Sequence, residues 1–288
     1  MLKLPPRPYE FPRFAPDGKR VAVETDDGKE DVIWVIDNLM AASPPRRLTM
    51  TGRNRFPIWN TDGERVAFQS DREGDLGIWW QRADGSGMAE RLTKAESGEA
   101  HIPNSWSPFD RDTFVFSVQK DDKFSLWTYS LKSRKATAFG GVVSSGIPDG
   151  TFSRDGRWIE YATRLGSGPS RIFIQPFPST SETYEIFEGS WAAWSSDGKE
   201  MFIFDGFGIT FNVVSIRTRP TVTIGNSLSL ELRGARAARA GNTVPRNWDI
   251  SPVDSRVLGV VTDEEFQKPQ INVVLNWFEE LKKRVPVQ

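Results

Sequence analysis

Few residues of this 288-residue chain could perform the common kinds of enzyme chemistry. Cysteine is absent, which excludes disulfide scaffolds, thiol catalysis, iron–sulfur clusters and cysteine zinc sites. The one histidine, His101, excludes multi-histidine metal centres and allows at most one Ser-His-Asp triad, which would have to use it. Neither a Gly-x-Ser-x-Gly motif nor the protein-kinase signature elements occur in the sequence. His101 is therefore the one candidate for a general base, and a hydrogen-bonding role is the interpretation we favour for it.

A second group of candidates has the side chains that divalent ions prefer. Glu10, Asn54, His101 and Asp149 could offer oxygen and nitrogen ligands to calcium or another divalent cation if the fold brought them together. No ligand spacing in the sequence demands a metal, and a polar site filled by water is the alternative that we favour. No cofactor is firmly implied.

An internal repeat decides where these residues lie in the fold. The unit is a large residue, two small or polar residues, Asp-Gly, a charge and an apolar run, as in FAPDGKRVAV (14–23) and WNTDGERVAF (59–68). WSPFDRDTFVF (106–116) and ISPVDSRVLGV (250–260) are degenerate copies without the glycine. The six copies, 42 to 57 residues apart, are marked by Asp17, Asp62, Asp110, Asp155, Asp197 and Asp254. Six copies near one period indicate an array of one structural unit.

Each unit predicts four short antiparallel strands. Asp-Gly fits a tight hairpin, because Asp can bond the turn backbone and Gly accepts a positive φ. The second strand is apolar at nearly every position, as in residues 201–204, so we expect it to be covered on both faces. The third strand carries an aromatic residue at one phase, and Trp34, Trp79 and Trp127 are expected to pack between neighbouring units. The sequence thus predicts an all-β fold, a six-bladed β-propeller of four-stranded antiparallel blades.

The chain is expected to form one propeller domain over residues 1–288. The last unit supplies three strands and then turns helical, so we predict that residues 2–4 close blade six as its outer strand and that a short C-terminal helix follows. The predicted blades cover residues 9–50, 51–95, 96–140, 141–187, 188–240 and 241–275 plus 1–8, and the helix covers 276–284.

These repeats resemble those of the TolB-like six-bladed propellers, the WD40-like or PD40 repeats. The signature P-x-[FW]-S-P-D-G-[KR] is nearest in residues 12–19 and 57–64. The tail INVVLNWFEELKKRVP (271–286) is similar to the end of bacterial chains in which such a propeller follows a serine/threonine kinase. The resemblance implies a protein-interaction or sensory module, often extracytoplasmic, or a propeller that filters access to a separate hydrolase domain.

Such propellers bind ligands around the mouth of the central channel. The repeat alignment places the starts of the innermost strands there, with a polar and chemically mixed set of side chains. Trp191 and Trp248 fall outside the blade-packing phase and are the first candidates for ligand contact. The full set of channel-face candidates is Glu10, Asn54, Arg55, His101, Asn104, Asp149, Trp191, Arg246, Asn247 and Trp248.

The balanced charge of the chain argues against two classes of partner, nucleic acids and anionic lipids. A formal charge of −1 is too balanced for a protein that mainly grips nucleic acid or anionic lipid. We expect no membrane span and no signal peptide in the chain as given, and we expect a monomer. These features do not specify the cellular compartment of the protein.

Three functions remain. The leading hypothesis is a non-catalytic propeller that recognises a protein segment or small ligand over the channel face. The alternative is a metal-assisted hydrolase of an ester, lactone or phosphotriester with its site in the central channel. A third is a domain that gates or orients a covalently attached neighbour.

Overall fold

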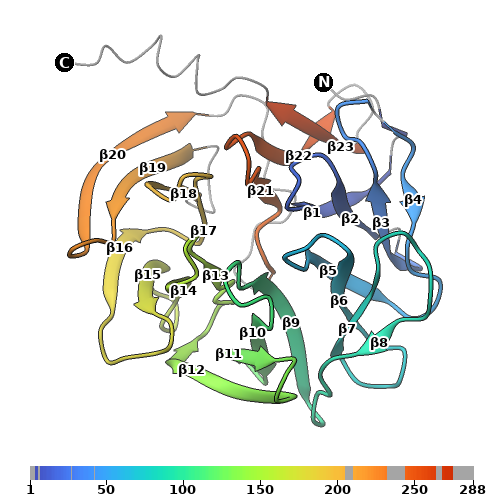
Figure 1. Ribbon diagram of the computed structural model, residues 1–288, viewed down its shortest axis with the longest axis horizontal. Helices are drawn as coiled ribbons and strands as arrows, with labels where there is room; N and C mark the ends of the chain where they lie inside the picture. Colours follow the sequence, from blue (N-terminus) through green and yellow to red (C-terminus); the bar gives the residue numbers. More distant parts are fainter. Residues whose placement is uncertain are drawn as a thin grey trace.

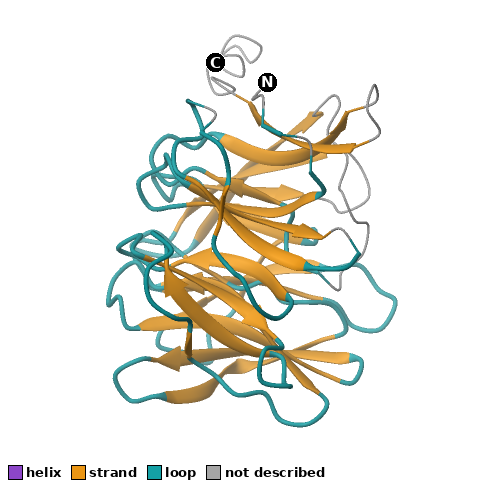
Figure 2. Cartoon of the chain, turned by 90° about the vertical axis from the view of Figure 1, so that its right-hand side faces the viewer, coloured by secondary structure: helices purple, strands orange, loops and turns teal. Residues whose placement is uncertain are grey.

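The computed structural model describes residues 4–5, 7–26, 28–41, 43–204, 210–231, 244–263 and 268–274. These residues form six antiparallel sheets arranged as blades around a central axis (Figure 1). Seen from the side, they are strands joined by loops, with no helix among them (Figure 2). The described part of the chain also has no helix long and apolar enough to cross a membrane. The predicted all-β propeller is confirmed.

The first three blades each have four strands in sequence order. Blade one contains β1 (Tyr9–Phe14), β2 (Val21–Asp26), β3 (Asp31–Ile36) and β4 (Arg46–Arg47). Blade two contains β5 (Asn54–Trp59), β6 (Arg65–Ser70), β7 (Gly77–Arg82) and β8 (Glu90–Arg91). Blade three contains β9 (Glu99–Trp106), β10 (Thr113–Lys120), β11 (Lys123–Ser130) and β12 (Lys135–Ser144).

The other blades follow the same order. Blade four contains β13 (Thr151–Phe152), β14 (Trp158–Thr163), β15 (Arg171–Pro176) and β16 (Tyr184–Glu188). Blade five contains β17 (Trp191–Trp194), β18 (Glu200–Phe204), β19 (Thr210–Arg217) and β20 (Thr223–Glu231). Blade six contains β21 (Trp248–Ile250), β22 (Val257–Asp263) and β23 (Lys268–Val274) among the described residues. The first strand of each blade lies nearest the axis (Figure 1).

The Asp-Gly pairs form the hairpins that the repeat predicts. Asp17 Oδ1 accepts hydrogen bonds from the backbone N–H groups of Lys19 at 2.7 Å and Arg20 at 3.0 Å, and Gly18 has φ +65°. The degenerate copies keep the turn without glycine, because Arg111 and Ser255 take positive φ values of 53° and 55°. The turn is therefore preserved where its sequence signature is lost.

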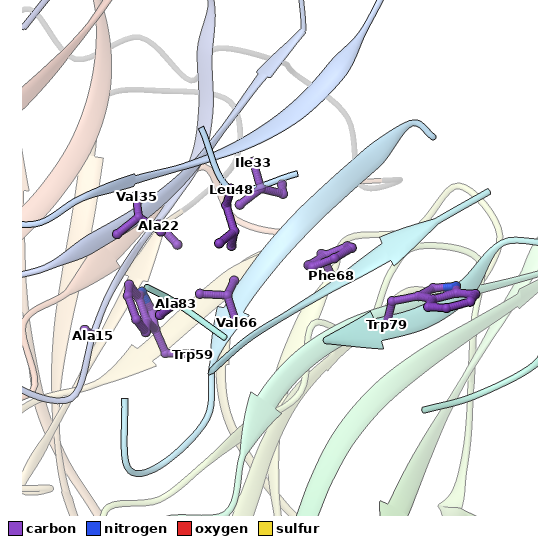
Figure 3. Close-up of a cluster of buried hydrophobic side chains, with 10 residues drawn as sticks. All are labelled: Ala15, Ala22, Ile33, Val35, Leu48, Trp59, Val66, Phe68, Trp79 and Ala83. Atoms are coloured by element: carbon purple, nitrogen blue, oxygen red, sulfur yellow. The ribbon is translucent and has the colours of Figure 1, made fainter. Parts of the chain in front are cut away.

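The apolar middle strands are buried between neighbouring blades, as predicted. Figure 3 shows one such interface, where Ala22 and Val35 of blade one meet Val66 and Phe68 of blade two. All four side chains are fully buried. Burial of a Val or Phe side chain contributes about 1.5–3 kcal/mol, so this interface holds the two blades together.

The aromatic residues of the third strands also pack as predicted. Trp79 lies in the core between blades one and two, and Trp34 and Trp127 pack partly buried against neighbouring clusters. The guanidinium groups of Arg72 and Arg91 lie 4.9 Å and 5.1 Å from the Trp79 ring centroid. Cation–π contact adds to the packing at this position.

Blades one and six are in contact, so the ring is closed. Asn247 Oδ1 accepts a hydrogen bond from Phe11 N–H at 2.6 Å, and Arg256 donates to the carbonyl oxygen of Gly18 at 3.2 Å. Leu4 packs against a cluster that includes Leu258 of blade six. Leu4 is not part of a strand, and the rest of the predicted closing strand (2–3) and the predicted helix (276–284) lie outside the described residues.

One strand departs from the expected blade limits. β12 continues to Ser144, although blade three was expected to end at residue 140. Gly140 and Gly141, with φ values of +61° and +66°, lie where the register of β12 against β11 shifts. The bulge lets the strand resume pairing beyond the glycines.

Candidate functional site

The end of the channel at which the innermost strands begin is filled by apolar side chains. Phe11, Phe56, Ile102, Phe124 and Ile147 form one buried cluster that draws on blades one, two, three and the start of blade four. The rings of Phe11 and Phe56 meet edge to face, with their centroids 4.9 Å apart. Val244, which precedes blade six, packs against the same cluster, so residues from around the axis meet here, and we infer that this cluster, which we call the channel plug, closes the channel at this end.

Phe11 and Phe56 contribute to the plug from irregular strands. The register of β1 with β2 shifts after Glu10, and that of β5 with β6 shifts after Arg55. At these bulges φ is +50° for Phe11 and +58° for Phe56. Positive φ is uncommon for residues other than glycine, and a bulge re-aims the side chain. The bulges could not be predicted from the residue types, because Phe at the start of a strand fits a regular pleat equally well.

Asn54 and Arg55, two predicted channel residues, are held by neighbouring groups at this end. Asn54 Nδ2 donates to the carbonyl oxygen of Gly52 at 2.7 Å, and its Oδ1 accepts from Arg72 at 2.8 Å. Arg55 Nε donates to the buried carboxylate of Glu24 at 3.3 Å. Burial raises the pKa of Glu24 to about 8, although Arg55 opposes the shift.

His101 is a buried hydrogen-bonding group. Its Nδ1 lies 2.8 Å from Thr93 Oγ1, and that hydroxyl oxygen accepts a hydrogen bond from Ile78 N–H at 3.0 Å. The Thr93 hydroxyl can donate to Nδ1 or accept from it, according to the tautomer, and Nε2 lies 3.8 Å from Glu99. Burial lowers the pKa of His101, while Glu99 and Asp75 oppose the shift. These contacts give His101 a place in the packing between blades two and three.

The predicted metal ligands are not gathered at one point. Within the ranges that the structure describes, no three His, Asp or Glu residues form a group that could hold a metal ion. Glu10, His101 and Asp149 accordingly do not form a ligand group that Asn54 could complete. Asp149 accepts hydrogen bonds from Arg246 instead.

A cavity of about 330 Å³ lies at the opposite end, where the innermost strands run into their turns. All six blades line it, and we call it the turn-face cavity. Because the plug fills the other end, this cavity is a cup rather than an open channel. Its lining residues are Arg13, Phe14, Pro16, Ile58, Trp59, Asn60, Thr61, Asn104, Ser105, Trp106, Pro108, Thr151, Phe152, Arg154, Ala193, Trp194, Arg246, Asp249, Ile250 and Pro252.

Two of the ten predicted channel-face residues, Asn104 and Arg246, line the turn-face cavity. Trp191 and Trp248, which were predicted to be the first candidates for ligand contact, do not line the cavity and instead lie in the core between blades five and six. Trp191 Nε1 donates to the carbonyl oxygen of Val244 at 3.1 Å. The Trp248 ring meets the edge of Phe211 at 4.8 Å between centroids.

Asp149 and Asn247 do not line the cavity. Asp149 contacts the lining residue Arg246, and Asn247 contacts Phe11 of blade one. Asp149 Oδ2 accepts hydrogen bonds from the backbone N–H of Arg246 at 3.1 Å and from its guanidinium at 3.4 Å. Asn247 holds Phe11, as described for ring closure. Their side chains support the site, and neither lines the cavity.

The charges at the cavity floor come from blades one and six. Arg246 lies 3.4 Å from Asp149 and 3.4 Å from Asp249, so two carboxylates surround this buried guanidinium. Burial lowers the pKa of Arg246, but these carboxylates outweigh it and raise the pKa overall. Burial and then the neighbouring Arg246 lower the pKa of Arg13 to about 10, while Asp249 and Asp149 oppose the shift. Both arginines therefore stay charged near neutral pH.

A protonated carboxyl group lies behind one wall. Thr151 lines the cavity, and its hydroxyl donates to Glu160 Oε2 at 2.6 Å. Burial raises the pKa of Glu160 to about 8; the Thr151 hydrogen bond and Arg246 oppose this shift, and Asp149 adds to it. Glu160 is thus mainly neutral at pH 7 and adds little negative charge near the floor.

Five lining residues have buried nitrogen donors without a hydrogen-bond partner in the described part of the chain. These atoms are Arg13 Nε, Arg246 Nε, Asn104 Nδ2, Trp106 Nε1 and Trp194 Nε1. All five residues are at most 7% exposed. Buried donors are nearly always paired in folded proteins, so the floor has hydrogen-bonding capacity for a further acceptor.

Arg13 lines the cavity but was not among the residues predicted from the sequence. It occupies the repeat position just before the large residue, where the other units have Ile58, Ser105, Thr151, Ala193 and Asp249. The sequence signal that could have found it is this contrast, since only the first and last units carry a charge there. These two units are neighbours in the closed ring, so the charges meet.

Two exposed apolar residues lie in turns at the mouth. Phe109 and Val253 are 82% and 61% exposed, next to the lining residues Pro108 and Pro252. They belong to the two degenerate repeats, in blades three and six, which face each other across the ring (Figure 1). An apolar rim thus partly surrounds a polar floor.

Comparison with known proteins agrees with this architecture. The family described as PD40, TolB beta propeller domain, matches residues 9–141. The uncharacterized peptidase YuxL of Bacillus subtilis is 27% identical over 154 residues, which are 51% of this chain and 22% of that protein. The chain therefore spans well under two thirds of that relative's length.

Two solved structures show the same fold. A putative TolB from Agrobacterium tumefaciens is 19% identical, with a TM-score of 0.61, over 78% of this chain and 81% of that one. An oligogalacturonate lyase in complex with manganese is 10% identical, with a TM-score of 0.63, over 93% and 89%. At these identities the likeness concerns the fold alone. The chain is a β-propeller whose residues 9–141 match the family described as PD40, TolB beta propeller domain.

Proposed function

We propose that this chain is a non-catalytic binding propeller that holds a small ligand or the end of a protein segment in the turn-face cavity. The carrying observation is one preformed cavity lined by all six blades, in which Arg13, Arg246 and Asn104, each with an unpaired buried donor, lie among apolar residues. A concave site with apolar walls and a few convergent polar groups is typical of ligand-binding sites.

The scaffold supports binding because the floor residues are positioned by strands. Arg13 lies within β1, and Asn104 lies within β9, each paired to a buried second strand. Arg246 is fixed by Asp149 and Asp249. Groups held by sheets and by supporting hydrogen bonds need little rearrangement when a ligand enters, which favours affinity.

The similar proteins leave the choice between binding and catalysis to the site, because they include a TolB, a peptidase and a lyase. No observation in the described residues specifically favours the metal-assisted hydrolase. We therefore propose binding as the single candidate function.

Indole N–H signals in NMR spectra test the proposal. Trp59, Trp106 and Trp194 line the cavity, whereas Trp34 and Trp158 lie elsewhere in the ring. A library of neutral, cationic and anionic fragments is titrated into the isotope-labelled protein. We expect fragments of at least one chemical class to shift the indole signals of the three cavity tryptophans and to leave the signals of Trp34 and Trp158 unchanged. A library that shifts none of the three cavity indoles contradicts the proposal.

A variant that fills the cup supplies the control. Ser105 is a small, half-buried lining residue on β9, and Ser105→Leu is designed to place added bulk at the cavity. The same fragments should then lose their effect on the cavity indoles while the protein keeps its folded spectrum. Binding that persists unchanged in this variant would place the ligand elsewhere.

A further inference from the structure

We propose that the ligand of the turn-face cavity is a monocarboxylate with an apolar remainder, whose carboxylate lies against Arg13, Arg246 and Asn104. This inference rests on the proposed function and specifies its ligand. It is carried by the partners of each arginine, the balance of charge around the floor, and the apolar walls.

Arg13 is a buried cation that has no acidic partner among the described residues. Its Nη1 donates to the carbonyl oxygens of Pro12 at 2.9 Å and Trp248 at 3.3 Å, and its Nη2 donates to that of Arg246 at 2.9 Å. Its Nε, directed at none of these, lacks a partner. A buried charge is costly unless a counter-charge neutralises it. An anion in the cavity next to Nε would supply that counter-charge.

The charged residues around the cavity that the structure describes leave one positive charge to be neutralised. Asp249 and Asp149 both form salt bridges with Arg246, so their two negative charges offset two of the three positive charges on Arg13, Arg246 and Arg154. Arg154, at the mouth, donates only to carbonyl oxygens, those of Ser195 at 3.1 Å and Trp194 at 3.3 Å. With Glu160 protonated, the cluster carries a net charge of +1 near neutral pH. A monoanion neutralises this charge, whereas a phosphate dianion exceeds it.

The number of donors is compatible with the acceptor positions of a carboxylate. Arg13 Nε, Arg246 Nε and Asn104 Nδ2 are three N–H donors, and a carboxylate offers about four acceptor positions. Asn104 presents its amide nitrogen rather than its oxygen, because Oδ1 accepts a hydrogen bond from Ser117 at 2.8 Å. Hydrogen bonds from charged donors to a carboxylate are about twice as strong as neutral ones. An uncharged amide ligand would lose this gain.

The walls above the floor are apolar. Ile58, Phe152 and Ile250 line the cavity together with three tryptophans, and Phe109 and Val253 stand at the mouth. A carboxylate on the floor thus directs the rest of the ligand toward apolar surface. A small aryl or alkyl acid has this chemistry, and so does the free carboxyl end of a peptide with an apolar last residue.

Isothermal titration calorimetry with matched ligands tests the inference on the wild-type protein. 3-Phenylpropionate is compared with 3-phenylpropanamide, and N-acetyl-Ala-Phe acid is compared with its C-terminal amide. We expect each acid to bind about tenfold or more tightly than its amide. The tighter of the two acids identifies the source as a small molecule or a chain end. The inference is overturned if each acid binds with the same affinity as its amide.

Inorganic phosphate provides the second arm. We expect phosphate to bind more weakly than 3-phenylpropionate at pH 7, because of its second charge and its lack of an apolar part. If phosphate binds more tightly than 3-phenylpropionate, the inference that the ligand is a monocarboxylate is overturned. If neutral or cationic fragments shift the cavity indoles while neither acid does, the carboxylate inference fails and the proposed function stands. If no fragment of any class binds, both fail.

Variants locate the binding groups. Arg13→Gln should weaken binding of 3-phenylpropionate about tenfold or more and leave binding of the amide nearly unchanged. Asn104→Leu should weaken the acid by a smaller factor, and it serves if Arg13→Gln does not fold. Arg82→Gln, in an exposed ion pair with Asp84, is the matched control and should bind like wild type. Full affinity for the acid in both cavity variants overturns the assignment.

Discussion

The guanidinium of Arg13 donates a hydrogen bond to the backbone carbonyl oxygen of Arg246 at 2.9 Å, although 233 residues separate the two in the chain. Arg13 lies in the first blade, and Arg246 immediately precedes the innermost strand of the last blade. The same two side chains line the turn-face cavity. Closure of the ring and construction of the site therefore depend on the same contacts.

Loss of Asp249 should weaken this closure. Asp249 Oδ2 accepts the backbone N–H of Phe14 at 2.8 Å, and its Oδ1 lies 3.4 Å from Arg246. Asp249→Ala leaves a buried donor unpaired and an arginine with one fewer carboxylate, so we expect a loss of about 2–4 kcal/mol in the free energy of unfolding. Urea unfolding followed by tryptophan fluorescence measures it. Asp84→Ala, in an exposed ion pair, should leave the midpoint unchanged, and an equally small effect at Asp249 would contradict the closure role.

Glu160 should make stability depend on pH. Burial raises its pKa in the folded protein to about 8, above the ordinary value of 4.5, while Thr151 and Arg246 oppose the shift and Asp149 adds to it. Between these two values the folded state holds a proton that the unfolded state releases. The stabilisation is complete below pH 4.5 and is lost as pH rises toward 8.

Glu160→Gln removes this proton linkage. The free energy of unfolding of the wild type should therefore fall relative to that of the variant as pH rises from 5 to 8, by at most about 1.4 kcal/mol per pH unit. Urea unfolding of both proteins at pH 5, 6, 7 and 8 gives the difference. Parallel pH profiles for the two proteins would show that Glu160 ionises normally in the fold.

Exchange of residues in the repeat turns should change stability in opposite directions. Gly198 has φ +69°, and a Cβ built there meets its nearest atom at 3.6 Å, so Gly198→Ala introduces backbone strain without a clash. We expect it to lower the free energy of unfolding by about 1 kcal/mol. Arg111, with φ +53°, occupies the same turn position in blade three, and Arg111→Gly should raise stability by a similar amount. Thermal unfolding compares them, and changes of the same sign would refute the equivalence of the turns.

His101 should prove important for packing and unimportant for ligand binding. Its Nδ1 is bonded to Thr93, it packs against Phe116, and it does not line the turn-face cavity. His101→Ala should therefore cost about 1–3 kcal/mol in stability. The affinity for 3-phenylpropionate, measured by calorimetry below the unfolding transition, should stay at the wild-type value. A large loss of affinity in a folded variant would restore the channel role that the sequence suggested.

The sequence was sufficient to predict the ring because the repeat combines several consistent local signals. Asp17-Gly18 specifies a turn, the apolar second strand specifies burial on both faces, and Trp79 marks the interface between blades. Each signal acts within one blade or between adjacent blades. Local rules are therefore enough to predict the architecture.

The position of the site depended on features that no repeat pattern contains. The bulges that accompany the positive φ of Phe11 and Phe56 close the predicted mouth, and a bulge leaves no mark in the residue types of these strands. Trp191 was expected at the channel because its repeat phase differs, but a bulky apolar ring gains more from the core between blades five and six. Arg13 and Asp249 form the floor only after the ring closes. Contacts of this range follow from the tertiary structure.

The most direct test of the account is a crystal structure of the protein with 3-phenylpropionate. The account predicts electron density for the ligand in the turn-face cavity, with its carboxylate within hydrogen-bonding distance of Arg13 Nε and Arg246 Nε. Ligand density at the opposite end of the channel, next to His101 and Asn54, would contradict it.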